Sequence, residues 1–423
     1  MNHFELQGGE LACEGVSLPA IAAAVGTPVY VYSSATLERH YQVLRDALVA
    51  AGLGQPLIAF AVKANSNVAV LKTLARLGCG ADVVSEGEIR RALTAGVPPG
   101  RIVYSGVGKT EAEIAFALKA GVAELNVESE PEMEAIACVA KALGVRAVIA
   151  IRVNPDVEAG GHAKISTGKA DSKFGVSFSE AARLYANAAN NANLDPVGLA
   201  YHIGSQIIDL APMEAACVKM RGLVEQLRAE GLSVRRLDLG GGLGVPYFNQ
   251  PDPPGVDAYA AMIARVMKGL DIEFAFEPGR MICANAGVLL ARVIHVHRRP
   301  EGRNFLVLDA AMNDLIRPAM YDAYHDIRPV KPRPGAPELY DVVGPVCESG
   351  DTFTRDRRLP PLEAGDLVAF MSAGAYGAAM ASEYNTRPLV PEVLVKADRY
   401  AVIRPRPSYD QILAAERPAP WFQ

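Results

Sequence analysis

The sequence predicts an α/β protein with a closed (β/α)8 barrel and a second, all-β domain of the sandwich or barrel type. Three observations lead to this prediction. Between about residues 57 and 280, short apolar segments alternate with longer amphipathic ones, as in repeated strand–helix units. Eight such short segments occur, which is the number that closes a barrel of roughly 250 residues. After Arg280 the chain changes to β-rich stretches separated by turns with glycine and proline.

Each expected barrel strand is short and apolar, and amphipathic helical patterns lie between the strands. The strands are expected over Leu57–Ala64, Gly80–Ser85, Arg101–Ser105, Ala123–Val127, Ala147–Asn154, Val197–Ile203, Arg236–Leu239 and Glu273–Glu277. The expected helices include Val68–Leu77, Glu111–Ala120, Glu130–Leu143, Ser179–Ala189, Met213–Glu230 and Ala258–Leu270, with Leu37–Ala51 before the first strand. Glycines typical of helix C-termini stand at Gly78, Gly96, Gly121, Gly144 and Gly231.

A chain of 423 residues exceeds what one hydrophobic core usually serves, and two domains are expected. Val29–Ser33 is a short strand before the first helix, so we expect the N-terminal segment to pair with the second domain. The barrel would comprise residues 31–282, and the β domain residues 1–30 together with 283–423. The β-rich stretches are Gly287–Val296, Asn304–Leu308, Leu339–Val346, Leu367–Met371 and Val393–Ile403, with a Pro-rich loop at Pro329–Pro337.

Composition and charge exclude several classes of protein. The 42 basic and 47 acidic residues give a net charge of −5 with no basic block, so a nucleic-acid-binding protein is not expected. The six cysteines are dispersed without a Cys-x-x-Cys pair, which indicates neither a disulfide framework nor a metal site and favours the reducing cytoplasm. The first 15 residues lack the charge and apolar pattern of a secretory signal. The longest apolar stretch, Leu367–Ala381, is too short for a membrane span.

A doubly wound open sheet is the alternative fold, and composition leaves the two folds about even. The polar residues favour the barrel, because they recur at the C-terminal ends of the expected strands. In a closed barrel these ends share one face, on which the active sites of such barrels lie. The residues concerned are Lys63, Asp82, Ser85, Arg152, Asn154, His202, Ser205, Gly240–Gly242 and Glu277–Arg280.

Two of these positions are candidates for binding a ligand. One could bind a ligand covalently and the other could bind an anion. Lys63 lies in the otherwise apolar Ala-Phe-Ala-Val-Lys-Ala-Asn, where desolvation favours a neutral amine that can form a Schiff base. A lone lysine at a strand end, however, more often reaches solvent. The Gly240–Gly242 run lets backbone N–H groups approach a phosphate, or simply forms a tight turn. Its position after the seventh strand, with Gly279 and Arg280 after the eighth, favours the phosphate site.

Glu277 and His202 complete the set. The Glu277 carboxylate ends an apolar strand and needs a partner, which is either a protonated pyridine nitrogen or, about equally, Arg280. His202 could stack on a flat ring, although for a lone histidine a place in the core is the better expectation. A lysine, a phosphate cradle, a stacking ring and a carboxylate together describe a site for pyridoxal 5'-phosphate, the electron sink for carbanions at Cα.

Nine motifs, spread over most of the chain, carry a family resemblance. They are Ala61–Asn65, His162–Gly168, Ser172–Gly175, His202–Gln206, Leu239–Gly244, Glu277–Arg280, Arg317–Tyr321, Cys347–Asp351 and Ser372–Gly377. In this order they resemble the diaminopimelate decarboxylase family, within the alanine-racemase-like and ornithine-decarboxylase-like pyridoxal phosphate enzymes of fold type III. The resemblance implies a homodimer with shared active sites, to which the β domain contributes.

The resemblance also implies roles for individual residues. Lys63 would bind the cofactor covalently, His202 would stack on its ring and Glu277 would hold its pyridine nitrogen protonated. Tyr376 would contact both cofactor and substrate. Cys347 would be the proton donor, supplied with Glu348 by the partner subunit. The phosphate would be surrounded by Ser205, Gly241, Gly242, Gly279 and Arg280.

The implied reaction is decarboxylation of meso-2,6-diaminopimelate to L-lysine and CO2, the last step of lysine biosynthesis by the diaminopimelate route. The distal end of this substrate bears both charges. Arg280, Arg317 and Tyr321 would bind its carboxylate and Glu348 its ammonium group. Without the motifs, Arg317 would be read as a surface arginine and Cys347 as a small buried hydrophobe.

Two other functions remain open at this point. One is a related decarboxylase that acts on ornithine, arginine or a carboxylated polyamine. The other is a catalytically silent homologue that binds the cofactor and regulates a partner, although the intact Lys63, Glu277 and Cys347 argue against it. The segment Ala159–Lys173, rich in glycine, lysine and serine, is a candidate for a mobile lid.

Overall fold

The computed structural model describes residues 2–158, 173–300 and 304–422. It divides into two compact units, a barrel unit of Leu37–Cys283 and a β unit of Met1–Thr36 with Ala284–Gln423. The N-terminal division lies a few residues beyond the expected one, because residues 31–33 complete a strand of the β unit. The candidate lid, residues 159–173, lies outside the described residues except at its last position.

The barrel unit contains eight parallel strands in one closed sheet. β12 pairs with β5 through Ala275 and Phe276, which closes the sheet, so the barrel is confirmed and the open-sheet alternative is wrong. Most strands end one to three residues before the expected position. Their bounds are β5 (Leu57–Ala61), β6 (Gly80–Val83), β7 (Ile102–Tyr104), β8 (Glu124–Val127), β9 (Ala147–Arg152), β10 (Leu194–Ala200), β11 (Arg236–Asp238) and β12 (Glu273–Phe276).

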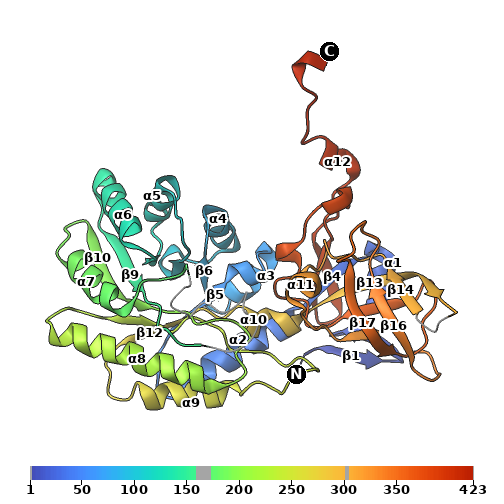
Figure 1. Ribbon diagram of the computed structural model, residues 1–423, viewed down its shortest axis with the longest axis horizontal. Coiled ribbons are helices and arrows are strands. Elements are labelled where there is room, and N and C mark those ends of the chain that lie inside the picture. The colour runs from blue at the N-terminus through green and yellow to red at the C-terminus, as the bar shows by residue number, and fades with distance from the viewer. Residues whose placement is uncertain (1, 159–172, 301–303, 423) are drawn as a thin grey trace. The chain divides into compact units, whose positions relative to one another are not determined.

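The helices of the barrel unit lie outside its strands (Figure 1). Their ends follow from the sequence: Thr110 forms a capping box with Glu113, and Gly121 ends the same helix at φ +77°, a conformation that favours glycine. The helices are α2 (Ser34–Ala50), α3 (Val68–Ala75), α4 (Glu86–Ala95), α5 (Glu111–Ala120), α6 (Glu130–Leu143), α7 (Phe178–Ala189), α8 (Leu210–Ala229), α9 (Val256–Val266) and the short α10 (Arg280–Cys283).

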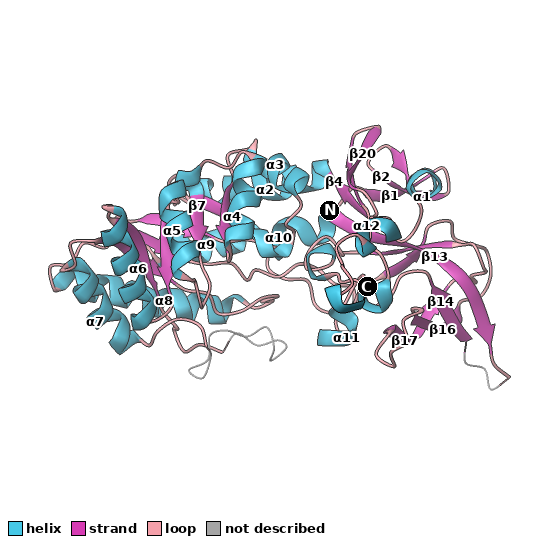
Figure 2. Ribbon diagram, turned by 90° about the horizontal axis from the view of Figure 1, so that it is seen from above, coloured by secondary structure: helices cyan, strands magenta, loops and turns pink. Residues whose placement is uncertain are grey.

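The β unit is built around its longest strand, β13 (Gly287–Arg298), in a nine-stranded sheet. β4 (Val29–Ser33) pairs antiparallel with β13 and parallel with β19 (Glu392–Lys396), which confirms that the N-terminal segment joins this unit. Figure 2 shows β13, β14 and β16 side by side. The remaining elements are β1 (Phe4–Gln7), β2 (Glu10–Cys13), β3 (Val16–Ser17), α1 (Leu18–Val25), β14 (Asn304–Leu308), α11 (Arg317–Tyr321), β15 (Ile327–Pro329), β16 (Glu338–Val343), β17 (Thr352–Leu359), β18 (Leu367–Phe370), β20 (Arg399–Arg404) and α12 (Tyr409–Leu413).

The β unit differs from the sequence prediction in several strands: β1, β2, β3 and β15 were not expected, and two further differences have a clear cause. The single strand expected over residues 393–403 is a hairpin of β19 and β20, in which Ala397 turns the chain at φ +55°. β17 was not expected, because its charged sequence Thr-Arg-Asp-Arg-Arg masks the alternation typical of a strand. Within the part of the chain that the structure describes, no helix has both the length and the apolar character needed to cross a membrane.

One hydrophobic cluster joins distant parts of the β unit. It contains Leu11 and Val29 from the N-terminal segment together with Leu290 on β13, Ala369 on β18 and Val393 on β19. Leu290 lies between its neighbours Val29 and Ala369 and is fully buried. The N-terminal segment is therefore a structural part of this unit.

Truncation of Leu290 tests this cluster. Leu290→Ala leaves a cavity between β4 and β18, and we expect the free energy of unfolding to fall by about 3 kcal/mol. Val402→Ala on the exposed face of β20 is the matched control and should change stability by less than about 0.5 kcal/mol. Urea unfolding monitored by circular dichroism measures both. Equal stabilities of the two variants would contradict the assigned core.

Candidate active site

The register of the barrel brings functional side chains from different strands to one end. Ala200 of β10 and Ala275 of β12 both pair with Asp238 of β11. Side chains alternate along a strand, so His202 and Glu277, two residues further on, point to the same side as Asp238. This is the C-terminal end of the barrel, where sequence analysis placed the site.

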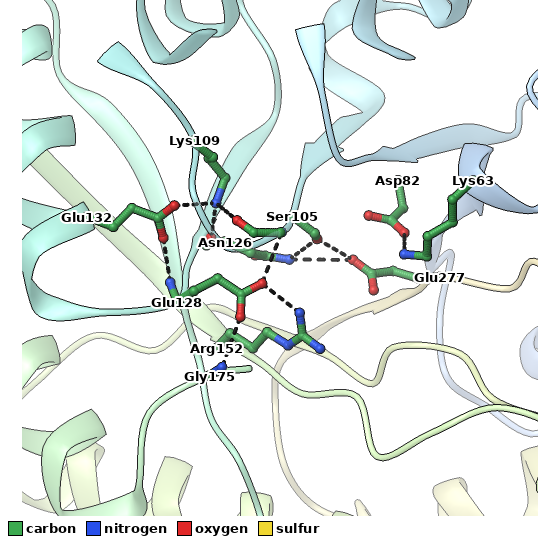
Figure 3. A network of polar contacts seen from close by, with 11 residues as sticks. Lys63, Asp82, Ser105, Lys109, Asn126, Glu128, Glu132, Arg152, Gly175 and Glu277 are labelled. Atoms are coloured by element: carbon green, nitrogen blue, oxygen red, sulfur yellow. Dashed lines mark hydrogen bonds and ion pairs between the residues drawn. The ribbon is translucent and has the colours of Figure 1, made fainter. Parts of the chain in front are cut away.

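Lys63 lies in the short turn that follows β5, and its Nζ is 2.7 Å from Oδ2 of Asp82 on β6 (Figure 3). Asp82 is fully buried, and its other oxygen, Oδ1, has no hydrogen-bond partner among the residues that the structure describes. The Lys63 side chain is 40% exposed in the single chain described. The amine lies beside a buried carboxylate that can accept its proton.

The Glu277 carboxylate is held from two neighbouring strands. Its Oε1 accepts hydrogen bonds from Ser105 Oγ at 3.2 Å and from Asn126 Nδ2 at 3.4 Å, and Asn126 Nδ2 also donates to Ser105 Oγ at 3.0 Å (Figure 3). The sequence did not identify Ser105 and Asn126 as site residues. A buried amide within the apolar segment of β8 was the only signal for Asn126.

Burial raises the pKa of Glu277 well above its ordinary value, and the nearby carboxylates of Asp238 and Asp82 raise it further. The charges of Lys63 and Arg152 act in the opposite direction. An anionic Glu277 therefore requires a cationic partner in the site. A protonated ring nitrogen would be such a partner.

The His202 ring is neutral and has a defined tautomer. Burial lowers its pKa to about 3, and the charges of Arg152 and Lys63 lower it further. The Gly241 N–H donates to His202 Nδ1 at 3.3 Å, which leaves the ring proton on Nε2. A neutral, half-buried imidazole at the barrel mouth suits stacking on a flat ring.

The loops after β10 and β11 form a glycine-lined cradle. The Ile207 N–H donates to Gly242 O at 2.9 Å, which joins the two loops. A Cβ at Gly241 would lie 2.3 Å from Glu277 O, and one at Gly242 would lie 2.6 Å from Gly204 O. Side chains are therefore excluded at both positions, because neighbouring loops pack closely against them, and the two glycines remain half-buried.

Arg280, directly after Gly279, adds a positive charge beside this cradle. Its Nε and Nη2 donate to Ser205 Oγ at 3.2 and 3.0 Å, and its Nη1 donates to Tyr247 OH at 3.1 Å. These hydrogen bonds fix the position of Arg280. The sequence had left open an ion pair with Glu277 instead. Tyr247 was missed, because it lies in an irregular loop without a motif.

In the β unit, Arg317 and Tyr321 lie one turn apart on α11 and share a face. Arg317 is buried, and its Nη1 donates to His325 Nε2 at 2.9 Å. His325 Nδ1 lies 2.9 Å from Met371 O and donates to it, which leaves Nε2 as the acceptor. The interpretation of Arg317 as a surface arginine is therefore wrong.

Cys347 and Glu348 lie in the loop after β16, and both are exposed. The buried carboxylate of Asp351 organises this loop by accepting the Val346 N–H at 2.7 Å, and Cys347 N–H donates to Asn385 Oδ1 at 2.9 Å. Cys347 is therefore not the small buried hydrophobe that its residue type alone suggests. The loop presents its thiol and a carboxylate to the surface of the described chain.

Tyr376 lies in the loop after β18 with φ +55°, a left-handed conformation that is rare for a bulky residue. Backbone hydrogen bonds from Ala373 N to Gly287 O and from Gly374 N to Ala284 O, at 2.8 and 3.0 Å, fix this loop. Such strain persists only where the surroundings impose it, and it is common at functional sites.

The groups at the barrel mouth fit pyridoxal phosphate. The amine of Lys63 and the carboxylate of Glu277 suit the aldehyde and ring nitrogen of this cofactor. The glycine loop at Gly241 and Gly242, where packing against neighbouring backbone excludes a Cβ, and the guanidinium of Arg280 suit its phosphate.

Comparisons with known proteins agree with this assignment. Residues 34–284 match the family model described as pyridoxal-dependent decarboxylase, pyridoxal binding domain. The chain is 51% identical over 420 residues to the diaminopimelate decarboxylase of Zymomonas mobilis subsp. mobilis, covering 99% of each chain. It is 48% identical over 421 residues to that of Vibrio cholerae, covering 99% of this chain and 100% of the relative.

The fold shows the same similarity. The crystal structure of diaminopimelate decarboxylase from Helicobacter pylori, complexed with L-lysine, aligns with a TM-score of 0.90 and 42% identity. The alignment covers 94% of this chain and 98% of that one. The resemblance inferred from the sequence motifs is thus confirmed. The chain belongs to the diaminopimelate decarboxylases, a family of pyridoxal-dependent decarboxylases.

Proposed function

We propose that this chain decarboxylates meso-2,6-diaminopimelate at its D-centre and releases L-lysine and CO2, using pyridoxal 5'-phosphate. This reaction is the last step of lysine biosynthesis by the diaminopimelate route. The observation that carries the proposal is the 51% identity to a diaminopimelate decarboxylase over 99% of both chains. The site at the barrel mouth supports it independently.

Lys63 would hold the cofactor covalently through Nζ. The amine must lose a proton before it becomes a nucleophile, and the Asp82 carboxylate at 2.7 Å can accept that proton. The bound cofactor supplies an electron sink for the electron pair that remains at Cα when CO2 leaves. Its phosphate would be bound by Ser205, Gly241, Gly242, Gly279 and Arg280.

Glu277 and His202 would hold the cofactor ring. The Glu277 carboxylate would keep a proton on the ring nitrogen, and Ser105 and Asn126 orient it by hydrogen bonds. His202, neutral under physiological conditions, would stack on the ring face. Burial of Glu277 makes its anion costly without a cation, so this position favours a protonated ring.

The substrate would be selected at its distal end, which carries both an ammonium group and a carboxylate. Arg280, Arg317 and Tyr321 would bind the carboxylate, and Glu348 would bind the ammonium group. The hydrogen bond from Arg317 to His325 supports this role, because it orients the guanidinium before the ligand arrives. Holding the distal end would also fix the orientation of the bond to the departing carboxylate.

Cys347 would donate the proton to Cα after CO2 leaves, and Tyr376 would contact cofactor and substrate. We further propose a homodimer in which Cys347 and Glu348 complete the site of the partner subunit. Their exposed position on a well-organised loop supports this arrangement.

We also propose a cytoplasmic location. The six cysteines are all free thiols, which supports it, because the cytoplasm is reducing.

Replacing Lys63 tests the covalent attachment of the cofactor. Lys63→Ala should abolish turnover and also the cofactor–protein adduct that borohydride traps, because no other group would bond the aldehyde at this site. Mass spectrometry of the borohydride-treated protein measures the adduct. Lys72→Ala, which removes an exposed lysine of α3, should retain both properties. An adduct that persists in Lys63→Ala would reject the assignment.

Replacing Cys347 tests the proton donor. Cys347→Ala should lower kcat by about a hundredfold or more with little change in KM, because general acid catalysis typically contributes that much. Cys138→Ala removes the other exposed cysteine, on α6, and should leave kcat unchanged.

Subunit mixing tests whether the site is shared. An equal mixture of Lys63→Ala and Cys347→Ala subunits should restore about a quarter of wild-type activity, because half of the dimers would be mixed and each mixed dimer would have one intact site of two. No recovery on mixing would exclude a shared site.

Product analysis tests the reaction itself. With pyridoxal phosphate and meso-diaminopimelate, mass spectrometry should detect L-lysine, carrying one carbon-bound deuterium when the solvent is D2O. Ornithine and arginine, tested in parallel, should give no amine product above background. Lysine formation no better than background would overturn the proposed substrate, and faster turnover of ornithine would assign the chain to the related decarboxylases.

A further inference from the structure

Glu128, between β8 and α6, joins three segments at the mouth of the barrel. Its Oε1 accepts the Gly106 N–H at 3.0 Å and Arg152 Nη1 at 2.6 Å, and its Oε2 accepts the Gly175 N–H at 2.9 Å (Figure 3). The side chain is 2% exposed. One buried carboxylate thus holds the backbone after β7, the backbone at Gly175 and the side chain at the end of β9.

A second buried ion pair fixes Glu128 in turn. The Glu128 N–H donates to Glu132 Oε2 at 2.7 Å, and Glu132 Oε1 accepts from Lys109 Nζ at 3.0 Å. Lys109 also donates to Gly106 O and to Asn126 O, at 2.9 and 2.7 Å. Both partners of the pair are buried, so Glu128 occupies a defined position rather than a flexible surface site.

The held group, Arg152, exerts its charge inside the active site. Its side chain is 11% exposed, and its Cζ lies 4.9 Å from the centre of the Phe174 ring. Its positive charge lowers the pKa of both His202 and Glu277. Arg152 therefore favours the neutral imidazole and the anionic carboxylate that a protonated cofactor ring requires.

Other charged groups face Glu277 from the strands packed around it. Asp238 on β11 and Asp82 on β6 oppose its ionisation, whereas Lys63 after β5 and Arg152 on β9 favour it. Lys63 is the residue proposed to bond to the cofactor. Arg152 does not take part in that bond, and its guanidinium is held by the ion pair with Glu128.

We propose that Glu128 is a positioning residue of the active site that acts through Arg152, by holding the guanidinium where its charge supports the anion of Glu277. This role rests on the proposed function only in that Glu277 serves the cofactor ring. If Glu128 only connected the loops by hydrogen bonds, its replacement would lower the stability of the protein but would not change the ionisation of Glu277.

Glu128→Gln is the first test. The variant removes the negative charge that pairs with Arg152 and turns one of the two acceptor oxygens into an N–H2 donor, so the guanidinium is held less firmly. The absorbance of bound pyridoxal phosphate, titrated with pH in the absence of substrate, reports the ionisation of the ring and Glu277. Since the charge of Arg152 lowers the pKa of Glu277, its displacement should move the acidic transition to higher pH. An unchanged transition would overturn the proposal.

Two further variants separate charge positioning from structural damage. Arg152→Met should shift the transition in the same direction, and adding Glu128→Gln to it should produce no additional shift. An equal extra shift in the double variant would show that Glu128 does not act through Arg152 and would overturn the proposal. Arg152→Met alone remains decisive if Glu128→Gln fails to fold, because an unshifted transition would also overturn it.

The matched control lies two residues further along the chain, at the first residue of α6. Glu130→Gln breaks an exposed ion pair with Arg183, 2.6 Å long, and should leave the transition and cofactor affinity at wild-type values. A shift in this control equal to that of Glu128→Gln would overturn the proposal. The titration uses pyridoxal phosphate without diaminopimelate, so its outcome is independent of the substrate assigned above.

Discussion

Closure of the barrel between β12 and β5 is the constraint on which the barrel site depends. Lys63 follows the first strand of the barrel and Glu277 follows the last. The two residues come close together only because β12 pairs with β5. Backbone bonds continue the closure past the strand ends, since the Ala61 N–H donates to Pro278 O at 3.1 Å. Because the sheet is parallel throughout, every strand delivers its last residues to the same mouth. The position of the amine relative to the carboxylate is thus a property of the sheet and not of flexible loops.

The interior of the barrel mouth is strongly acidic. Burying several carboxylates close together lowers the stability of the folded protein, but it prepares the site for a cation. Burial raises the pKa of Asp238 and of Glu277, and nearby carboxylates, Asp82 among them, raise both pKa values further. The Gly240 N–H bonded to Asp238 Oδ1 at 2.7 Å, together with Lys63 and Arg152, offsets part of this cost. A cofactor that carries a ring proton supplies the missing cation, so binding should relieve repulsion that the empty protein retains.

The local elements could be predicted closely, because their signals are local. α5, α6 and β14 have the expected bounds, since hydrophobic periodicity and end glycines define them. Most barrel strands were predicted too long at their C-terminal ends, because residues such as Lys63 and His202 continue the apolar run without a turn signal. The site residues that bear family motifs were named in advance, but Ser105, Asn126 and Tyr247 were not. Their roles depend on contacts between strands that no sequence pattern encodes.

The position of β4 has a consequence for how the chain reaches this structure. β4 is made before the barrel, yet both of its neighbours, β13 and β19, are made after it. During synthesis the barrel can close while β4 still exposes unpaired backbone on both sides. A free strand edge of this kind invites pairing with other chains. The complete sheet therefore forms only after β19 and β20 have left the ribosome, and it depends on contacts between distant parts of the chain, which form more slowly than local ones.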